Sequence, residues 1–431
     1  MGPAVWMPGM DGGDPEENGM DYDPTAYDCL TTLSLGWPSL SFDIIPDSLG
    51  GPRTAFPHTL TFVAGSQAPS TRMNSLSVCR VTGLGQLKTG KEAPRKEEGD
   101  SDDEDSSDSS DSDDDLLEDP RTLPKPHVRR VAHSGAINRV RAQPQNPALV
   151  AAWSESGTAS VYDLTGPLAE AAAEGEPDAR ARSAWAALTR SARTAAAPRA
   201  TRWTGRAWRR GRLVAGDRRA HIAVWEPQAA GRWAVGAPFR GHEGSVEDLQ
   251  WSPSEETVFA SCSVDHTVRV WDTRVRERSM LSVRAHDAEV NVISWSAATS
   301  YMMASGGDDG LLRVWDLRAF GPDAAYVASL KYHSGPVTSV EWCPHESSML
   351  LTTSEDGQTA VWDLALERDP EEEAALAPAE NAAVPDELPA QLLFVHAGQR
   401  DVKEGHWHPQ IPGLIVTTAA EGFNLFKAAN V

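Results

Sequence analysis

The sequence has no hydrophobic run long enough for a transmembrane helix, because none of its apolar stretches approaches the ~20 residues that cross a bilayer. Its first 30 residues are acidic and contain neither a basic start nor an apolar stretch, so we expect no secretory signal. The four cysteines lie far apart, without a Cys-x-x-Cys pair. A disulfide framework or a zinc ribbon is therefore not expected, and reduced thiols in a cytosolic or nuclear protein are the simplest interpretation.

Basic residues are scarce, with 39 Lys and Arg against 62 Asp and Glu and a formal net charge of -23. This balance argues against nonspecific nucleic-acid binding as the main activity and favours a basic protein partner. We expect no direct sequence-specific nucleic-acid binding and no membrane partner.

Motifs of the common enzyme classes are also missing. The chain has no Walker loop, no Gly-x-Ser-x-Gly and no His-Glu-x-x-His, so we predict a protein that is not an enzyme and has no cofactor. His406 and His408 are the one pair that suggests metal ligands, and we do not expect them to bind a metal together.

One segment carries most of the negative charge. Between Glu97 and Asp119 there are 14 Asp and Glu and no Lys or Arg. Like charges repel and nothing apolar offsets the entropy of ordering, so we expect a disordered loop at residues 91–126. The loop either improves solubility only or is a polyanion that holds a basic protein. Its candidate partner-binding residues are Asp102, Asp103, Glu104, Asp105, Asp108, Asp111, Asp113, Asp114 and Asp115.

Three serines of this run, Ser101, Ser110 and Ser112, have an acidic residue three positions later. This pattern resembles acidophilic casein-kinase sites, and each phosphate would add roughly -1.5 to -2 charges. We also expect a second acidic insert at 367–390 and a disordered N-terminus at 1–22.

The C-terminal half of the chain repeats itself. Trp-Asp pairs begin at Trp271, Trp315 and Trp362, which are 44 and 47 residues apart. A second Trp stands twenty residues before each pair, and a His stands nine residues before that Trp. An Asp stands six residues before each pair, and a Ser or Thr stands four residues before that Asp. A His and an Asp that recur in every copy indicate a repeated structural network rather than a metal site or an acid–base dyad.

Each copy also alternates in the manner of β-strands. Segments such as VEDLQWSP are followed by a buried run, a tight turn and a closing run such as TVRVWD. Further copies lie around residue 70, at 133–164, before Trp225 and from about 391 to 426, which brings the total to seven.

Four short strands per 40–47 residues with a closing Trp-Asp resemble the WD-repeat β-propeller. The predicted fold is therefore an all-β, seven-bladed propeller. The resemblance implies that the His, Ser or Thr, Asp and Trp of one blade form a buried hydrogen-bond network. The three implied networks are His242–Ser261–Asp265–Trp271, His286–Ser305–Asp309–Trp315 and His333–Thr352–Asp356–Trp362.

A closed ring needs an N-terminal strand to complete its last blade, since closure is what hides the sheet edges. We predict that WPSLSFDIIPD, at 37–47, is this closing strand. DPTAYDCLTTLSLG before it is predicted to be a short helix with Tyr27, Leu30 and Leu33 on one face. Residues 23–50 are thus the predicted N-terminal segment and 51–431 the predicted propeller.

One region does not follow the repeat. The blade that ends at Trp225 should contain a Trp about twenty residues earlier, but residues 165–212 are rich in Ala and Arg and lack periodicity. A basic RNA-binding patch is one interpretation, formed by Arg199, Arg202, Arg206, Arg209, Arg210 and Arg212.

We favour a shifted reading frame, from roughly residue 165–175 to about 211. When the codons for ATRWTG, at 200–205, are moved back by one base, they permit Gly-Tyr-Ala-Leu-Asp-Trp. This reading returns a Trp to the position that the repeat requires.

Longer segments are similar to one WD-repeat group, and they cover the chain from about residue 20 except for 165–212. They resemble the glutamate-rich WD-repeat proteins of ribosome assembly, which are related to histone-binding WD-repeat subunits of chromatin-assembly complexes. The segments include YDCLTTLSLGWPSLSFDIIPDSLG, HSGAINRVRA, GHEGSVEDLQWSPSEETVFASCSVDHTVRVWD and QLLFVHAGQRDVKEGHWHPQIPGL. The chain departs from the group in Gly405 and in using Asp and Ser rather than Glu in its acidic loop.

This resemblance implies a chaperone, located in the nucleus and nucleolus with exchange to the cytoplasm left open, that binds a basic large-subunit ribosomal protein of the L-three type. It would deliver this client to pre-ribosomal particles. A histone-binding protein of chromatin assembly is the first alternative, for which the resemblance implies contacts from Tyr27, Leu30, Trp37 and Phe42. A ubiquitin-ligase substrate adaptor is the second alternative, because Trp271–Arg274 and Trp315–Arg318 match a short Trp-Asp-x-Arg pattern.

Overall fold

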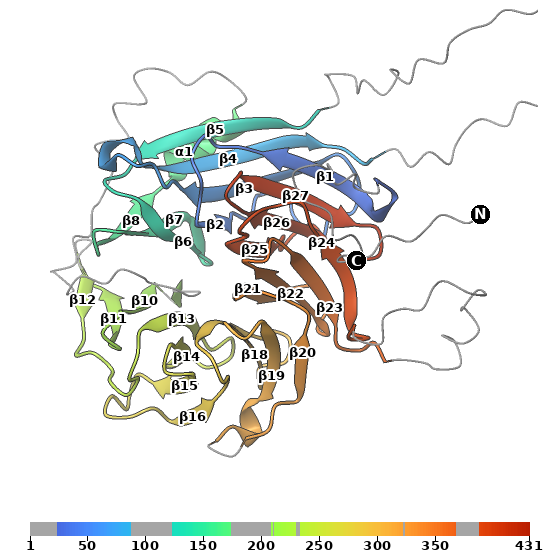
Figure 1. The fold of residues 1–431 in the computed structure, drawn as a ribbon. Coiled ribbons are helices and arrows are strands. Elements are labelled where there is room, and N and C mark those ends of the chain that lie inside the picture. The colour runs from blue at the N-terminus through green and yellow to red at the C-terminus, as the bar shows by residue number, and fades with distance from the viewer. Residues whose placement is uncertain are drawn as a thin grey trace, which may run out of the picture.

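The computed structural model describes residues 24–87, 123–173, 208–209, 211–229, 233–321, 324–367 and 388–431. Seven antiparallel sheets, here called blades 1 to 7 from β2 onward, surround a common centre (Figure 1). The predicted seven-bladed propeller is confirmed. In this described part of the chain, no helix is long and apolar enough to cross a membrane.

Each blade is ordered from the innermost strand outward. Blades 1 to 3 contain β2 (Ser41–Ile44), β3 (His58–Gly65), β4 (Ser75–Leu84), β5 (Lys125–Ala132); β6 (Ile137–Gln143), β7 (Asn146–Ser154), β8 (Ala159–Asp163); and β9 (Trp208–Arg209), β10 (Arg212–Gly216), β11 (Ile222–Pro227), β12 (Trp233–Val235). Blades 4 and 5 contain β13 (Val246–Trp251), β14 (Val258–Ser263), β15 (Thr267–Asp272), β16 (Leu281–Arg284); and β17 (Val290–Trp295), β18 (Met302–Gly307), β19 (Leu311–Asp316), β20 (Ala328–Lys331). Blades 6 and 7 contain β21 (Val337–Trp342), β22 (Met349–Ser354), β23 (Thr359–Asp363), β24 (Leu392–His396); and β25 (Glu404–Trp407), β26 (Leu414–Thr418), β27 (Phe423–Ala428), β1 (Tyr27–Leu33).

The helix α1 (Thr165–Ala172) and three 3₁₀ turns, Pro24–Ala26, Thr71–Met73 and Leu317–Ala319, complete the described elements. The hydrophobic core lies between neighbouring blades, where side chains from facing sheets interdigitate. The closing Trp271, Trp315 and Trp362 are almost completely buried in it.

A hydrogen-bonded chain of four side chains fixes each of blades 4 to 6. In blade 5 the Nε1–H of Trp315 donates to Oγ of Ser305 (2.9 Å), and this oxygen lies 2.8 Å from Nε2 of His286. The Nδ1 of His286 lies 3.0 Å from Asp309. Since an indole only donates and a carboxylate only accepts, the hydroxyl donates to Nε2 and Nδ1–H donates to Asp309. The same contacts join His242, Ser261, Asp265 and Trp271, and His333, Thr352, Asp356 and Trp362.

The titration of the blade 4 chain agrees with this proton arrangement. Burial lowers the pKa of His242, although Asp265 opposes the shift, so the ring is neutral. Burial alone would raise the pKa of Asp265, but the hydrogen bond from His242 holds it below its ordinary value. The recurring His and Asp therefore hold strands together with a satisfied, buried hydrogen-bond chain.

Side chains on the innermost strands also tie each blade to the next. Oδ2 of Asp248 accepts the backbone N–H of Ile293 at 3.0 Å, and Oε2 of Glu341 accepts that of Trp407 at 3.2 Å. A buried backbone N–H without a partner would cost free energy, so these acceptors stabilise the ring from inside. The side chains that make such bonds are Ser41, Asp43, Asp248, Gln250, Ser294, Glu341 and Glu404.

The strand that closes the ring is β1, and the prediction of a helix there is wrong. β1 pairs with β27 from Tyr27 opposite Ala428 to Leu33 opposite Phe423. Tyr27 and Cys29 are buried, as the alternation of an extended strand requires. An unpaired β27 would leave an open sheet edge, and this tertiary need decides the conformation of a segment too short for its periodicity to be diagnostic.

The assignment of the closing strand to 37–47 is also wrong, because β2 within that stretch is the innermost strand of blade 1 and pairs only with β3. Blade 1 therefore begins before residue 51. β5 begins at Lys125, so the last two residues of the interval 91–126 belong to a strand rather than to the acidic loop.

A buried carboxylate joins the two ends of the ring. Oε2 of Glu404 in β25 accepts the backbone N–H of Phe42 in β2 at 2.9 Å. Its other oxygen pairs with Arg139 and Arg141 of β6, and its side chain is 1% exposed. Burial alone would raise the pKa of Glu404, but the charges of Arg141 and Arg139 hold it well below the ordinary value. One ionised side chain thus connects blades 7, 1 and 2.

Blade 3 is the irregular blade. Its innermost strand β9 has two residues, whereas β13, β17 and β21 have six each. Residues 165–172, at the start of the anomalous segment, form α1, whose Pro167 and Ala171 are buried. Residues 174–207 and 210 lie outside the described residues, so the shifted reading frame stays a prediction.

We predict that replacing Glu404 by Ala lowers the free energy of unfolding by roughly 3–5 kcal/mol at neutral pH, because two arginines lose their buried partner. Since the pKa of Glu404 is lowered in the folded state, the contribution is present at neutral pH and is lost as the pH falls through the folded pKa. Urea denaturation measures the change. Glu421→Ala, which removes an exposed ion pair with Arg400 in the same region, is the control and should cost less than about 1 kcal/mol. Equal losses for the two variants would contradict the role of Glu404.

The frame hypothesis is tested by resequencing the transcript that encodes residues 165–212. We expect one shift near the start of this region and a compensating shift near residue 211. The restored Gly-Tyr-Ala-Leu-Asp-Trp would place an Asp one residue before Trp, which is the position of the inter-blade acceptors Gln250, Ser294 and Glu341. An unbroken frame that encodes the present arginines would reject the hypothesis.

Candidate functional site

A polar cavity of about 900 Å³ opens at one end of the central channel. The innermost strands begin at this cavity, which places Arg139, Glu247, Asn291 and Thr338 in its wall. The second strand of each blade returns antiparallel to the first, so the residues that follow β18 and β22, Asp308 and Glu355, reach the same rim. We call this cavity the funnel. Its full lining is Leu40, Asn138, Arg139, Arg218, Ser245, Glu247, Val264, Glu289, Asn291, Asp308, Pro336, Val337, Thr338, Glu355 and Lys403.

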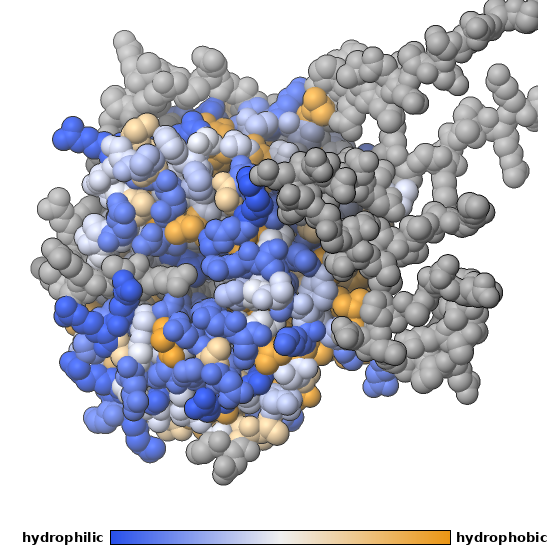
Figure 2. All heavy atoms as spheres, in the orientation of Figure 1, coloured by the Kyte–Doolittle hydropathy of each residue, from blue (hydrophilic) through white to orange (hydrophobic). Residues whose placement is uncertain are grey.

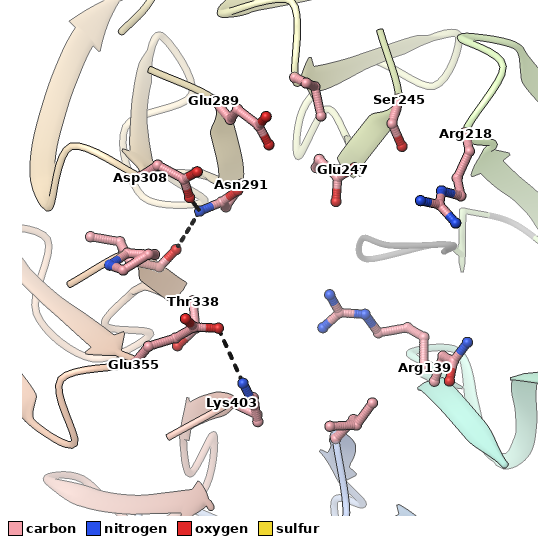
Figure 3. A pocket seen from close by; sticks show the side chains of 15 residues that line it. Arg139, Arg218, Ser245, Glu247, Glu289, Asn291, Asp308, Thr338, Glu355 and Lys403 are labelled. Carbon is pink, nitrogen blue, oxygen red and sulfur yellow. Dashed lines mark hydrogen bonds and ion pairs between the residues drawn. The ribbon is translucent and has the colours of Figure 1, made fainter. Parts of the chain in front are cut away.

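Charges of opposite sign occupy different parts of the funnel wall. Figure 3 shows Glu247, Glu289 and Asp308 on one side, and Arg139 and Arg218 across the opening from them. The acidic three come from blades 4 and 5, and the arginines come from blades 2 and 3. The funnel is therefore suited to charged polypeptide groups rather than to an apolar ligand.

Two of the charged groups in the wall are already compensated within the protein. Nζ of Lys403 lies 3.1 Å from Oε1 of Glu355, and Arg139 pairs with Glu404 below it. Asp308 accepts only the neutral amide of Asn291, at 2.7 Å.

Below the funnel, the channel is filled by buried charged groups. A second cavity of about 40 Å³ shares Arg139 and Thr338 with the funnel and is also lined by Asp248, Glu404 and His406. Burial raises the pKa of Asp248, although nearby Arg139 opposes this. The channel therefore narrows from an open charged mouth to a small space inside the ring.

The arrangement offers binding rather than catalysis. Among the described residues, no group of three or more His, Cys, Asp and Glu side chains is placed to hold a metal. His406 directs its Nδ1 to Glu341 at 2.8 Å, whereas Nδ1 of His408 accepts the backbone N–H groups of Gln410 and Ile411. The four cysteines are buried with raised thiol pKa values, because burial disfavours the thiolate.

The acidic segments of the sequence are attached at the face opposite the funnel. β4 and β23 run away from the funnel, because each is the third antiparallel strand of a blade whose first strand starts there. The connections from Leu84 to Lys125 and from Asp363 to Leu392 therefore leave and return at the opposite face. β1, which is antiparallel to β27, also begins at that face with Tyr27. The attachment points belong to the three adjacent blades 6, 7 and 1.

The predicted N-terminal contact residues have different surroundings. Phe42 is fully buried, and Tyr27 is 7% exposed with its hydroxyl 2.9 Å from Nδ1 of His396. These two are core residues, so the expectation that they contact a partner is wrong. Leu30 is half-buried, and only Trp37, at 38% exposure, offers a large free surface.

The predicted acidic contact residues from Asp102 to Asp115 and the predicted phosphorylation sites Ser101, Ser110 and Ser112 lie outside the described residues. The surface that is described in Figure 2 is mostly hydrophilic on the side shown, with scattered hydrophobic residues. The two Trp-Asp-x-Arg arginines, Arg274 and Arg318, are exposed and pair with Asp272 and Asp316.

Sequence reasoning missed the funnel residues. A polar residue stands at or next to the first position of the inner strands in VEDLQW, VNVISW and VTSVEW, and Glu289 immediately precedes the second of these. This recurrence was a usable signal, because equivalent positions of successive blades must converge on the axis of a closed ring.

Comparison with known protein families agrees with the fold. The sequence model described as "WD domain, G-beta repeat" matches residues 234–272, 277–316 and 324–363, which contain blades 4 to 6. The model that describes the histone-binding protein RBBP4, or the equivalent component of the CAF1 complex, matches residues 17–84, which contain β1 to β4.

Three relatives match nearly the whole chain. Protein HEAT STRESS TOLERANT DWD 1 of Arabidopsis thaliana is 46% identical over 433 residues, which span 99% of this chain and 92% of the relative. Glutamate-rich WD repeat-containing protein 1 of Dictyostelium discoideum is 47% identical over 99% of this chain and 85% of its own length. Ribosome assembly protein rrb1 of Schizosaccharomyces pombe is 36% identical over 98% of this chain and 84% of its own length. The shared propeller, the match of the N-terminal segment and this coverage show that the chain belongs to the family of glutamate-rich WD-repeat proteins, which is related to histone-binding WD-repeat proteins.

Proposed function

We propose that this protein is a non-enzymatic WD-repeat scaffold in ribosome biogenesis that binds a basic large-subunit ribosomal protein, of the L-three type, before it joins pre-ribosomal particles. The observation that carries the proposal is the run of 14 acidic residues without a Lys or Arg, inserted between the paired strands β4 and β5. The 36% identity to a relative named as a ribosome assembly protein supports the process. On this proposal the protein works in the nucleus and nucleolus.

The acidic run neutralises the basic extension of the client. Each exposed charge pair contributes less than about 1 kcal/mol, but many pairs add up along a polyelectrolyte contact. Two further acidic stretches start from the same face of the propeller: residues 1–23 have six acidic residues and no basic one, and 367–390 have eight acidic residues and one Arg. Three polyanions attached to adjacent blades give one face an affinity for a densely basic partner. Such binding weakens as salt screens the charges.

The release of the client follows from the same physics. Ribosomal RNA carries a higher density of negative charge than the acidic segments, so it competes for the same basic extension when the client reaches its binding site. Phosphorylation of Ser101, Ser110 and Ser112 would add negative charge and tighten the hold on the client.

A histone-binding function is the second candidate, because residues 17–84 match the histone-binding family model. Histones are also basic, so the acidic run alone does not separate the two clients. The exposed Trp37, between β1 and β2, is the residue of this segment available for such a contact.

The test is affinity purification of the tagged full-length chain at low salt, followed by mass spectrometry. In one variant, all 14 acidic residues of 97–119 are replaced by Asn or Gln, which keeps the length of the segment. The matched control replaces the acidic residues of 367–390 in the same way. We expect one large-subunit ribosomal protein to dominate the wild-type sample, to fall strongly in the first variant and to fall less in the control, because that segment carries about half the charge.

The chromatin function makes a different prediction in the same experiment. Core histones would dominate, would persist when 97–119 is neutralised and would be lost when Trp37 is replaced by Ala. That outcome would overturn the proposed function. Deleting residues 23–47 is not a valid test, since it removes the ring-closing strand β1 and the inner strand β2.

A further inference from the structure

We propose that the funnel is a second client-binding site, which takes one isolated Lys or Arg side chain from a polypeptide segment with uncharged neighbours. The inference rests on the proposed function only in requiring a basic client. It differs in place and in chemistry from the acidic run, which favours dense positive charge and is attached at the opposite face.

The size of the cavity is the first argument. A volume of about 900 Å³ falls within the range of ~300–1,000 Å³ that is typical of ligand sites, and it is large enough for a side chain with part of its backbone. The wall is formed by the innermost strands, which are held to one another by buried side-chain acceptors. The site is therefore pre-organised and needs little ordering when an occupant binds.

The second argument is uncompensated charge. Within the described part of the chain, no cation lies within ion-pair distance of Glu289 or Asp308. Both residues are exposed to the funnel, and the nearly buried Glu247 stands beside them (Figure 3). A cation placed between blades 4 and 5 would meet these three carboxylates together.

The third argument is an unsatisfied hydroxyl. Oγ of Ser245 is buried and has no hydrogen-bond partner among the described residues, and its side chain points into the funnel (Figure 3). A buried hydroxyl without a partner is unfavourable, and an ammonium or guanidinium group is a donor that would satisfy it.

The opposite wall limits how much positive charge can enter. Arg218 and Arg139 face the acidic residues across the opening, so a second Lys or Arg next to the first would lie close to a like charge. The funnel thus favours an isolated basic residue, whereas the acidic run binds consecutive ones. A client held at both faces must present both kinds of segment.

The experiment places a photo-crosslinking benzophenone amino acid at Ser245 in the tagged full-length chain, irradiates the purified complex and maps the crosslinked client peptide by mass spectrometry. We expect one client segment with a single Lys or Arg near the crosslink. Glu289→Lys combined with Asp308→Lys should lower the crosslink yield roughly tenfold or more, because like charges at an interface are strongly unfavourable. Glu277→Lys combined with Glu367→Lys makes the same charge change at the opposite face and should leave the yield unchanged.

The outcomes separate this inference from the proposed function. If the client copurifies but gives no crosslink at Ser245, or if the Glu289 and Asp308 reversals change the yield no more than the control reversals, the funnel is not a client site while the proposed function stands. If no basic protein copurifies with the unsubstituted chain, the proposed function fails and this inference fails with it.

Discussion

Closure of the ring is the constraint on which the rest of this structure depends. Six blades complete their described sheets from consecutive strands, but blade 7 obtains its outermost strand from β1, at the other end of the chain. Tyr27 adds a hydroxyl contact to His396, and Glu404 joins blade 7 to blades 1 and 2 through Phe42, Arg139 and Arg141. Without these contacts the edges of β27 and β2 would be open, and the inner strands would lose the common axis that forms the funnel.

Closure also divides the molecule into two faces with different chemistry. One face has the funnel, a rigid cavity in which a few charges are fixed by strand geometry. The other face has the attachment points of segments whose charge is dense and of one sign. A rigid site recognises the position of a group, whereas a polyanion responds to total charge. The two together would allow a scaffold to select one basic protein among many and still release it to RNA.

The repeats made most of the fold predictable from sequence. Each of blades 4 to 6 has its own His, hydroxyl, Asp and Trp, and the spacing of the four is set by the lengths of strands and turns, so a local pattern contains the information. β1 was not predictable in this way, because YDCLTTL is seven residues long and its partner lies almost 400 residues later. The choice between helix and strand was made there by the free edge of β27, which no local pattern reveals.

The same reasoning explains the errors at the candidate site. Tyr27 and Phe42 were taken for contact residues because large aromatic side chains often anchor partners, yet here they fill the ring closure. Glu289, Asp308 and Arg218 are each far apart in sequence and become a site only when the axis brings blades 3 to 5 together. Residues of this kind follow from topology and not from composition.

The most direct test of ring closure compares the equilibrium unfolding of two shortened chains, one beginning at residue 24 and one at residue 35. The first keeps β1 and should unfold with the midpoint and the cooperativity of the full-length chain. The second lacks β1, so we expect a lower midpoint and a broader transition as the open edge of β27 frays. Identical unfolding of the two shortened chains would contradict the role of β1 as the strand that closes the propeller.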